Sequence, residues 1–149
     1  MPRFLLPLML PLLLAACADP PPPVDHTARR AALHTELKQT LGADWEAGAD
    51  QFLTGARTDR GEQIYNKSCG NCHGTDLRGR GPRSGGMDPP PQPLVGPDRA
   101  PLPPAALVHL ISKGSPGTAM APWGRAFDEA QIRDVVAFIW AKKAAAELE

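Results

Sequence analysis

The sequence predicts a small all-α fold, in which three to four core helices are joined by long loops and preceded by a tether helix. Three observations predict this class. Several stretches carry apolar residues at helical spacing, glycine and proline concentrate in one long stretch over 74–104, and a cysteine- and histidine-containing motif lies directly before it at 69–73. We expect the 149 residues to divide into a leader over 1–16, a spacer and tether helix over 17–56, and a helical domain over 57–149.

The motif consists of Cys69, Cys72 and His73, in the pattern C-x-x-C-H of c-type haem attachment. Two thiols at this spacing on a short turn can each bond one vinyl group of a haem, and the histidine that follows can give a ring nitrogen to the iron. The pattern is specific because three rare residues must occur in this order. We therefore predict one covalently bound haem c with His73 as an iron ligand. A haem would also supply the apolar centre that a chain with 5% aromatic residues otherwise lacks.

The first sixteen residues predict a secretory signal. A single basic residue, Arg3, precedes an apolar run over 4–16, which is too short for a membrane span of about 20 residues. The run ends in Leu-Ala-Ala-Cys at 14–17, which resembles the lipobox of bacterial lipoproteins and implies acylation of Cys17. An ordinary signal peptide that leaves Cys17 as a free thiol is the alternative. Either reading places the mature protein outside the cytoplasm, and the lipid would anchor it on the periplasmic side of a bacterial membrane.

The mature chain is expected to begin with a spacer and a tether helix. Four consecutive prolines predict a stiff, extended spacer. A helix is expected over 26–41, ended by Gly42; it could pack on the domain, bind a partner or extend the tether. The segment 42–55 is expected to be a loop anchored by Trp45 and Phe52. The narrow apolar stripe of the helix is formed by Leu33, Leu37 and Leu41.

The first core helix is expected to run from about Arg60 to Lys67 and to deliver the chain to Cys69. Asp59 with Glu62 three residues later fits a capping-box start. Gly61 lowers helix stability relative to alanine, so we expect another element to approach closely at that position.

Two further helices are expected after the long loop. One begins at Pro103 or Pro104 and ends at Gly114. The other is capped by Asp128, with Gln131 completing a capping box. The long loop between the motif and the first of these helices would count against a compact domain, but such a loop can wrap a haem. The apolar stripes are Leu107, Leu110 and Ile111 in the first helix, and Ile132, Val135, Val136, Ile139 and Trp140 in the second.

The iron also needs a sixth ligand, unless that position is left open for chemistry. Met120 stands in a short loop between two helices, which could bring its thioether to the haem face opposite His73. A methionine could equally fill a gap in the core. His109 lies off its helix stripe and is expected to be exposed. The full set of candidates is Met87, Met120, His26, His34 and His109.

Residues from about 57 to 146 resemble the class I cytochromes c. The order of elements is the same: a helix ending at C-x-x-C-H, a loop, a middle helix, a methionine loop and a last helix. The family's glycine and aromatic residue on the first helix match Gly61 and Tyr65. The aromatic residue near the end of the last helix matches Phe138, with Trp140 as a second option. The resemblance implies an all-α cytochrome c fold in which these two helices cross closely.

The resemblance also implies two contacts with the haem. It assigns Met120 as the axial ligand opposite His73, although Ala121 separates Met120 from Pro122, where the commonest family motif has the proline next. It assigns Pro82 as the proline whose carbonyl accepts a hydrogen bond from the second ring nitrogen of the proximal histidine. A plain turn proline is the alternative for Pro82.

Histidine and methionine on both faces leave the iron no site for a substrate. The predicted function is therefore one-electron transfer between periplasmic or membrane redox proteins, and not catalysis. A haem enzyme or gas sensor with an open or displaceable sixth position is the alternative, and a thiol redox protein is disfavoured because the βαβ context is missing. A formal net charge of zero argues against a nucleic-acid partner. Three arginines in the long loop could contact a haem propionate or an acidic partner, or simply be solvated: Arg78, Arg80 and Arg83.

Overall fold

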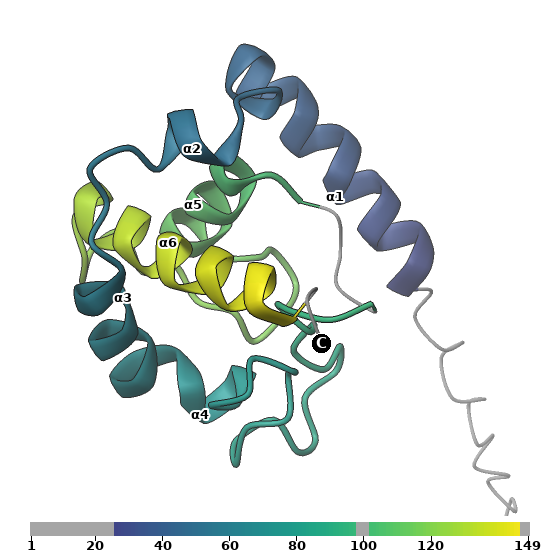
Figure 1. Ribbon diagram of the computed structural model, residues 1–149. Helices are drawn as coiled ribbons and strands as arrows, with labels where there is room; N and C mark the ends of the chain where they lie inside the picture. Colours follow the sequence, from purple (N-terminus) through teal and green to yellow (C-terminus); the bar gives the residue numbers. More distant parts are fainter. Residues whose placement is uncertain (1–25, 98–101, 147–149) are drawn as a thin grey trace, which may run out of the picture.

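A computed structural model describes residues 26–97 and 102–146, and every regular element in these ranges is a helical turn or helix (Figure 1). The predicted all-α class is confirmed. The leader, the proline spacer and the predicted lipidation site at Cys17 lie outside the described residues. In chain order the elements are α1 (His26–Leu41), the 3-10 turn η1 (Gly42–Trp45), α2 (Ala49–Phe52), α3 (Thr58–Ile64), the π-helical turn η2 (Tyr65–Cys69), α4 (Gly70–His73), α5 (Pro104–Lys113) and α6 (Glu129–Ala146).

The centre of the fold is the packing of α6 against α3 and α5 (Figure 1). At the crossing of α3 and α6, Gly61 is buried against the α6 backbone. A Cβ atom at this position would overlap the carbonyl oxygen of Asp134. The predicted close approach at Gly61 is confirmed, and glycine is required because the two backbones leave no room for a side chain.

An aromatic pair also packs α6 against the π-helical turn that follows α3. Tyr65 is fully buried, Phe138 is 3% exposed, and their ring centroids lie 5.3 Å apart at an angle of 48°. Tilted aromatic pairs at this distance stabilise a contact beyond the area they bury. Phe138 is therefore the residue of α6 that faces Tyr65, and the second option, Trp140, contributes to a pocket elsewhere.

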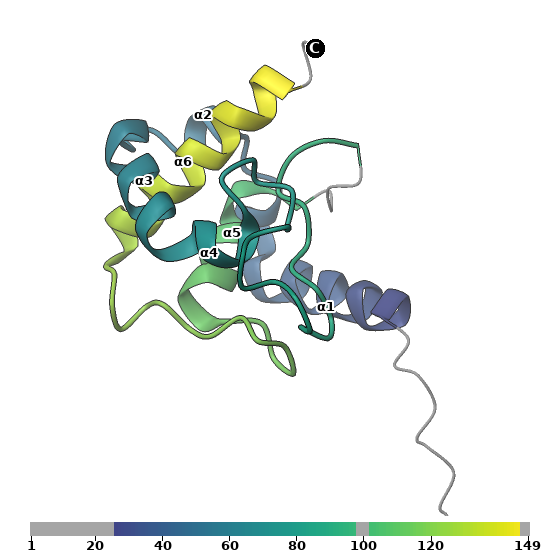
Figure 2. The ribbon, with the colours of Figure 1, turned by 90° about the horizontal axis from the view of Figure 1, so that it is seen from below.

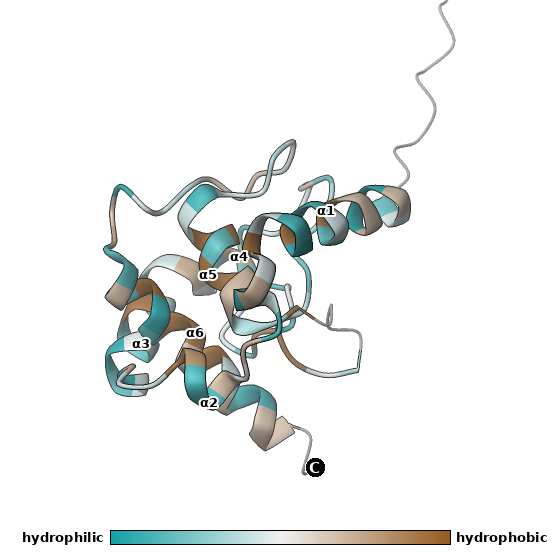
Figure 3. Ribbon diagram, turned by 90° about the horizontal axis from the view of Figure 1, so that it is seen from above, coloured by the Kyte–Doolittle hydropathy of each residue, from teal (hydrophilic) through white to brown (hydrophobic). Residues whose placement is uncertain are grey.

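The core follows the predicted stripes. Ile132, Val135, Val136 and Ile139 of α6 are all buried, and the long loop adds Leu77 and Val95. Figure 3 shows the hydrophobic residues gathered on α5 and α6, whereas α1 is largely hydrophilic. The stretch over 74–97 is irregular, as predicted, yet it takes part in the core.

The two capping predictions had different outcomes. The capping box of α6 is present: the N–H of Asp128 donates to Oε1 of Gln131 at 3.0 Å, and the N–H of Gln131 donates to Oδ1 of Asp128 at 2.8 Å. The capping box predicted at Asp59 is wrong, because α3 begins at Thr58, two residues before the expected start, and Asp59 already lies in its first turn.

A carboxylate from α6 takes the place of the predicted cap on α3. Asp134 is buried, with 1% of its surface exposed. Its Oδ1 accepts from the N–H of Arg57 at 2.7 Å, directly before α3, and its Oδ2 accepts from the side chain of Arg60. An anion near the first turn of a helix is stabilised by the unpaired N–H groups there. The start of α3 is thus held by α6.

α1 lies along the domain with its leucine stripe inward. Leu37 is buried, Leu33 and Leu41 are half-buried, and the helix packs against α5. Of the three roles considered for this helix, packing on the domain is the one observed. Gly42 follows the last residue of α1 with a φ of +52°, as expected for a glycine stop.

The segment after α1 was predicted as a loop and instead holds η1 and α2. Both are too short to show an apolar period, which is why the pattern did not reveal them. Phe52 packs against the core as predicted, under the guanidinium of Arg133 at 4.3 Å from its ring centroid. None of the helices in the described part of the chain has the length and apolar character needed to cross a membrane.

Candidate haem-attachment site

The motif sits on a turn that differs from the helix leading to it. Regular α-helix ends at Ile64, and the five residues of η2 form a wider π-helical turn before α4 presents Cys72 and His73. Such turns occur frequently at functional sites because they redirect side chains within a helix. The hydroxyl of Tyr65, at the start of η2, donates to the carbonyl of Gly74 at 2.8 Å, just beyond α4. One buried side chain therefore spans the whole motif.

The loop after α4 returns to it and binds its backbone. Three loop N–H groups donate to three successive motif carbonyls: Gly79 to His73 at 2.8 Å, Gly81 to Cys72 at 3.1 Å, and Arg83 to Asn71 at 2.8 Å. A Cβ atom on Gly81 would overlap the carbonyl of Asn71. The glycines of this loop thus permit direct backbone contact, which holds the motif in one conformation.

The side chains of the motif carry the chemistry that a covalent haem requires. Cys69 and Cys72 are both free thiols and both half-buried. Burial raises the pKa of the Cys69 thiol to about 11, and the neighbouring Cys72 adds to the shift. Neither thiol is engaged in a disulfide, and the raised pKa keeps Cys69 in its protonated form at neutral pH.

His73 is held as a neutral imidazole. Burial lowers its pKa, and the nearby backbone of Gln92 opposes this shift without reversing it. Its Nδ1 atom is buried, and no described group forms a hydrogen bond with it. A neutral ring is the form that binds a metal. Two free thiols beside a neutral histidine on one turn fit a haem c held by Cys69, Cys72 and His73.

In this structure, Pro82 does not make the contact with His73 that the family resemblance implies. It is exposed, and its carbonyl accepts nothing from Nδ1 of His73. Its role at the haem stays a prediction. The three loop arginines, Arg78, Arg80 and Arg83, are all exposed, which agrees with either of their predicted roles.

Met120 lies in a segment folded back on the end of α5, here called the methionine loop (residues 115–124). Figure 2 shows this segment, in light green, along the lower edge of the view, below α5. The N–H of Ser115 donates to the carbonyl of Met120 at 3.0 Å, and a Cβ on Gly114 would lie 2.8 Å from that carbonyl oxygen. The N–H of Trp123 donates to Ile111 of α5 at 2.9 Å. The backbone around Met120 is thus defined, and its side chain is half-buried.

Two of the other candidates for the sixth position, His26 and His34, have side-chain contacts of their own. Nε2 of His26 lies 2.7 Å from Oδ1 of Asp88. The ring of His34 packs edge-on against Trp45, with centroids 4.6 Å apart. His109 was predicted to be exposed, and it is half-buried on α5.

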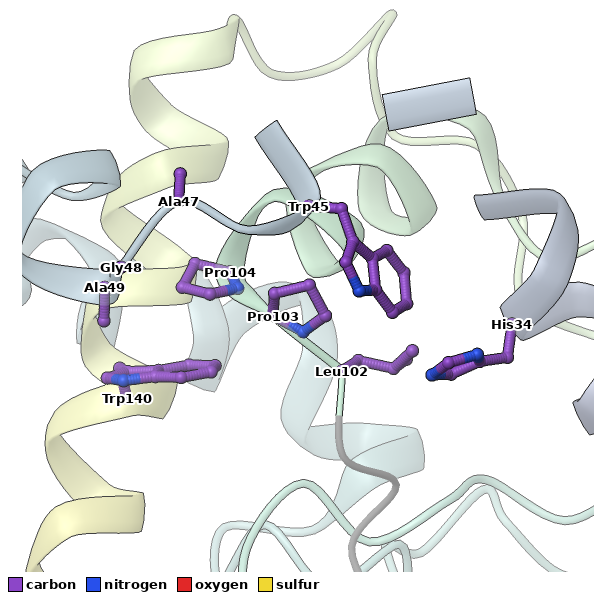
Figure 4. A pocket seen from close by; sticks show the side chains of 9 residues that line it. All are labelled: His34, Trp45, Ala47, Gly48, Ala49, Leu102, Pro103, Pro104 and Trp140. Carbon is purple, nitrogen blue, oxygen red and sulfur yellow. The ribbon is translucent and has the colours of Figure 1, made fainter. Parts of the chain in front are cut away.

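A pocket of about 560 Å³ lies between η1 and the start of α5, with α6 at its side (Figure 4). Trp45 and Trp140 stand on opposite sides of it, with Leu102 and Pro103 between them. Cys69, Cys72, His73 and Met120 do not line it, so it is separate from the attachment site.

Helix crossing, aromatic pair and C-x-x-C-H turn together define a class I c-type cytochrome domain. Residues 56–139 match the family model described as cytochrome C oxidase, cbb3-type, subunit III, and the chain belongs to this family. A cytochrome c domain of this kind implies haem c as its cofactor and redox proteins as its partners.

Comparison with solved structures gives a similar fold. The chain is similar to a chain of the Kuenenia stuttgartiensis reducing HAO-like protein complex, with a TM-score of 0.51 and 27% sequence identity. The similarity covers 62% of this chain and 46% of that chain, so it extends over less than half of the neighbour. No curated protein matches the chain.

Proposed function

We propose that this cytochrome c domain carries single electrons between redox proteins, with its haem iron ligated by His73 and Met120. The observation that supports this most is the fixed C-x-x-C-H turn, in which a neutral, half-buried His73 follows two free thiols. A ligand on a rigid turn changes its geometry little between oxidation states, which suits a carrier.

The cofactor, when bound, supplies reversible one-electron chemistry at its iron. Cys69 and Cys72 would hold it through thioether bonds, and His73 would give its ring nitrogen to the iron. The loop N–H groups of Gly79 and Gly81 keep the motif backbone in place. Met120 would close the other iron face against outside ligands and raise the potential relative to a second histidine.

We infer a membrane-bound location on the periplasmic side, through a lipid on Cys17. The Leu-Ala-Ala-Cys sequence at 14–17 supports this, and several acyl chains together give stable anchoring. Contacts with electron donors and acceptors would be small and transient. The exposed arginines at 78, 80 and 83 are candidates for such a contact, which higher salt would then weaken.

Spectroscopy of wild type and Met120→Ala tests the ligation. The oxidised wild-type holoprotein should show the weak far-red band of a methionine–iron bond, and its reduced form should bind carbon monoxide slowly. Met120→Ala should keep the haem covalently attached on a denaturing gel, lose the far-red band and bind carbon monoxide rapidly. Met87→Ala serves as the matched control and should behave as wild type. A wild type without the band that binds carbon monoxide rapidly would favour a haem enzyme or gas sensor instead.

Fractionation of cells tests the anchor. Cys17→Ser should move the protein from the membrane pellet to the soluble periplasmic fraction, because a single change removes every acyl chain. Cys17→Ser that stays in the pellet after a high-salt wash would contradict the lipid anchor.

A further inference from the structure

The face of α1 that packs on the domain extends beyond its leucines, toward the N-terminal end of the helix. Leu33, Leu37 and Leu41 repeat every four residues, and Arg29 stands four residues before Leu33 on the same face. Arg29 is half-buried, whereas its neighbour Arg30 is exposed. The N-terminal half of α1 has no buried residue, since Leu37 is the buried residue of this helix. Polar contacts therefore hold this half against the domain.

The contact made by Arg29 is with the methionine loop. Its Nη2 donates to the carbonyl of Pro116. A Cβ atom on Gly117 would lie 2.9 Å from the same Nη2, so the guanidinium also packs closely on the backbone of this residue. Arg29 of α1 thus contacts Pro116 and Gly117, the tip of the loop that carries Met120.

The tip is tied to Met120 by short bonds. The N–H of Ser115, next to Pro116, donates to the carbonyl of Met120 at 3.0 Å. The hydroxyl of Thr118 donates to the carbonyl of Ser115 at 2.7 Å and accepts from the N–H of Met120 at 3.0 Å. Residues 115–120 therefore form a closed turn, and a restraint on the carbonyl of Pro116 acts on the backbone of Met120.

The turn has few apolar contacts to keep it closed. Pro116, Gly117, Ala119 and Ala121 are all exposed, so the loop buries few apolar contacts. Segments of this kind open locally at low free-energy cost. A charge-assisted hydrogen bond to a carbonyl is stronger than a neutral one, so the bond from Arg29 shifts the loop toward its closed form.

We propose that Arg29 is a positioning residue for the iron ligand Met120, so that α1 acts as a strap on the methionine loop. The inference rests on the proposed His73–Met120 ligation. Opening of the loop would break the methionine–iron bond, and the opening equilibrium therefore sets how readily an outside ligand displaces Met120. Arg29 makes that displacement harder without touching the iron.

Imidazole displacement measures this equilibrium directly. We would titrate imidazole into the oxidised full-length holoprotein and follow loss of the far-red band, for wild type, Arg29→Ala, Arg29→Lys and the control Arg30→Ala. Alanine is the best helix former, so α1 is preserved in both alanine variants. Arg30→Ala removes the same charge from the same helix, but within the described residues the side chain of Arg30 forms its hydrogen bond with Thr27 of its own turn.

Arg29→Ala should bind imidazole about fivefold more tightly, as expected for loss of a partly exposed charged hydrogen bond. Arg30→Ala should stay within about twofold of wild type. Arg29→Lys, which keeps a cationic donor, should recover part of the exclusion. If wild type shows the far-red band but Arg29→Ala and Arg30→Ala bind imidazole with equal affinity, the positioning role of Arg29 is overturned. The proposed His–Met ligation would then still stand. A wild type without the band would overturn both.

Discussion

The motif region (residues 58–83) and the methionine loop (115–124) are held in place by different means. In the motif region, Tyr65 is fully buried, a helix crossing excludes any side chain at position 61, and successive carbonyls of α4 receive bonds from the next loop. The methionine loop is mostly exposed and is held by its own turn, by the end of α5 and by one arginine from α1. Changes in the first region should lower the stability of the whole domain, whereas changes in the second should alter access to the iron.

The largest effect is expected from Gly61→Ala. The added methyl group would overlap the carbonyl of Asp134, so the two helices must separate. We expect a loss of about 3 kcal/mol in the free energy of unfolding, measured by denaturant unfolding. Gly48→Ala is the matched control, since a Cβ there meets nothing within 4 Å. A domain that accepts alanine at 61 without loss would show that the crossing is looser than the contact indicates.

Asp134→Ala should have the next largest effect. It removes the carboxylate that accepts from the N–H of Arg57 and from Arg60. The side chain of Arg60 is 38% exposed and stays solvated, so we expect a loss of about 2 kcal/mol and not the larger cost of a fully buried unpaired charge. Thermal unfolding of the holoprotein would measure it. Asp59→Ala, on the exposed side of the same turn, should leave stability close to that of wild type; equal losses in the two variants would contradict the cap from α6.

Tyr65→Phe should have the smallest effect of the three. It keeps the ring pair with Phe138 and removes only the hydroxyl that donates to the carbonyl of Gly74. Leaving that buried carbonyl unpaired should cost about 1 kcal/mol of unfolding free energy. The far-red band and imidazole affinity should stay at wild-type values, in contrast with changes in the methionine loop. A shift in imidazole affinity would show that the two regions are coupled.

Features that follow from helical spacing or from the family pattern could be predicted from the sequence, whereas features that depend on a residue distant in the chain could not. Gly61, Tyr65 and Phe138 were predictable because helical spacing and the family resemblance place them on facing helices. The cap on α3 was not, because Asp134 reaches it from the far end of the domain and no local pattern marks such a partner. The same holds for Arg29, although its place one step beyond the leucine stripe is visible in the sequence.

The site shows the same division. Cys69, Cys72 and His73 form a contiguous motif, and the structure brings them together on one turn as the motif requires. Pro82 and Met120 depend on loop conformation, which periodicity does not encode. The hydrogen bonds from Gly79 and Gly81 were hidden in a stretch where glycine indicates only a turn.

The position of Asp134 in the chain also constrains the order in which parts of the domain can fold. The first turn of α3 is completed by a residue of α6, so the beginning of the domain cannot reach its final form before its end has been synthesised. Contacts of such wide sequence separation close late in folding, because a long loop must first lose its freedom. A chain ending before α6 should therefore leave the first turn of α3 without the carboxylate that completes it.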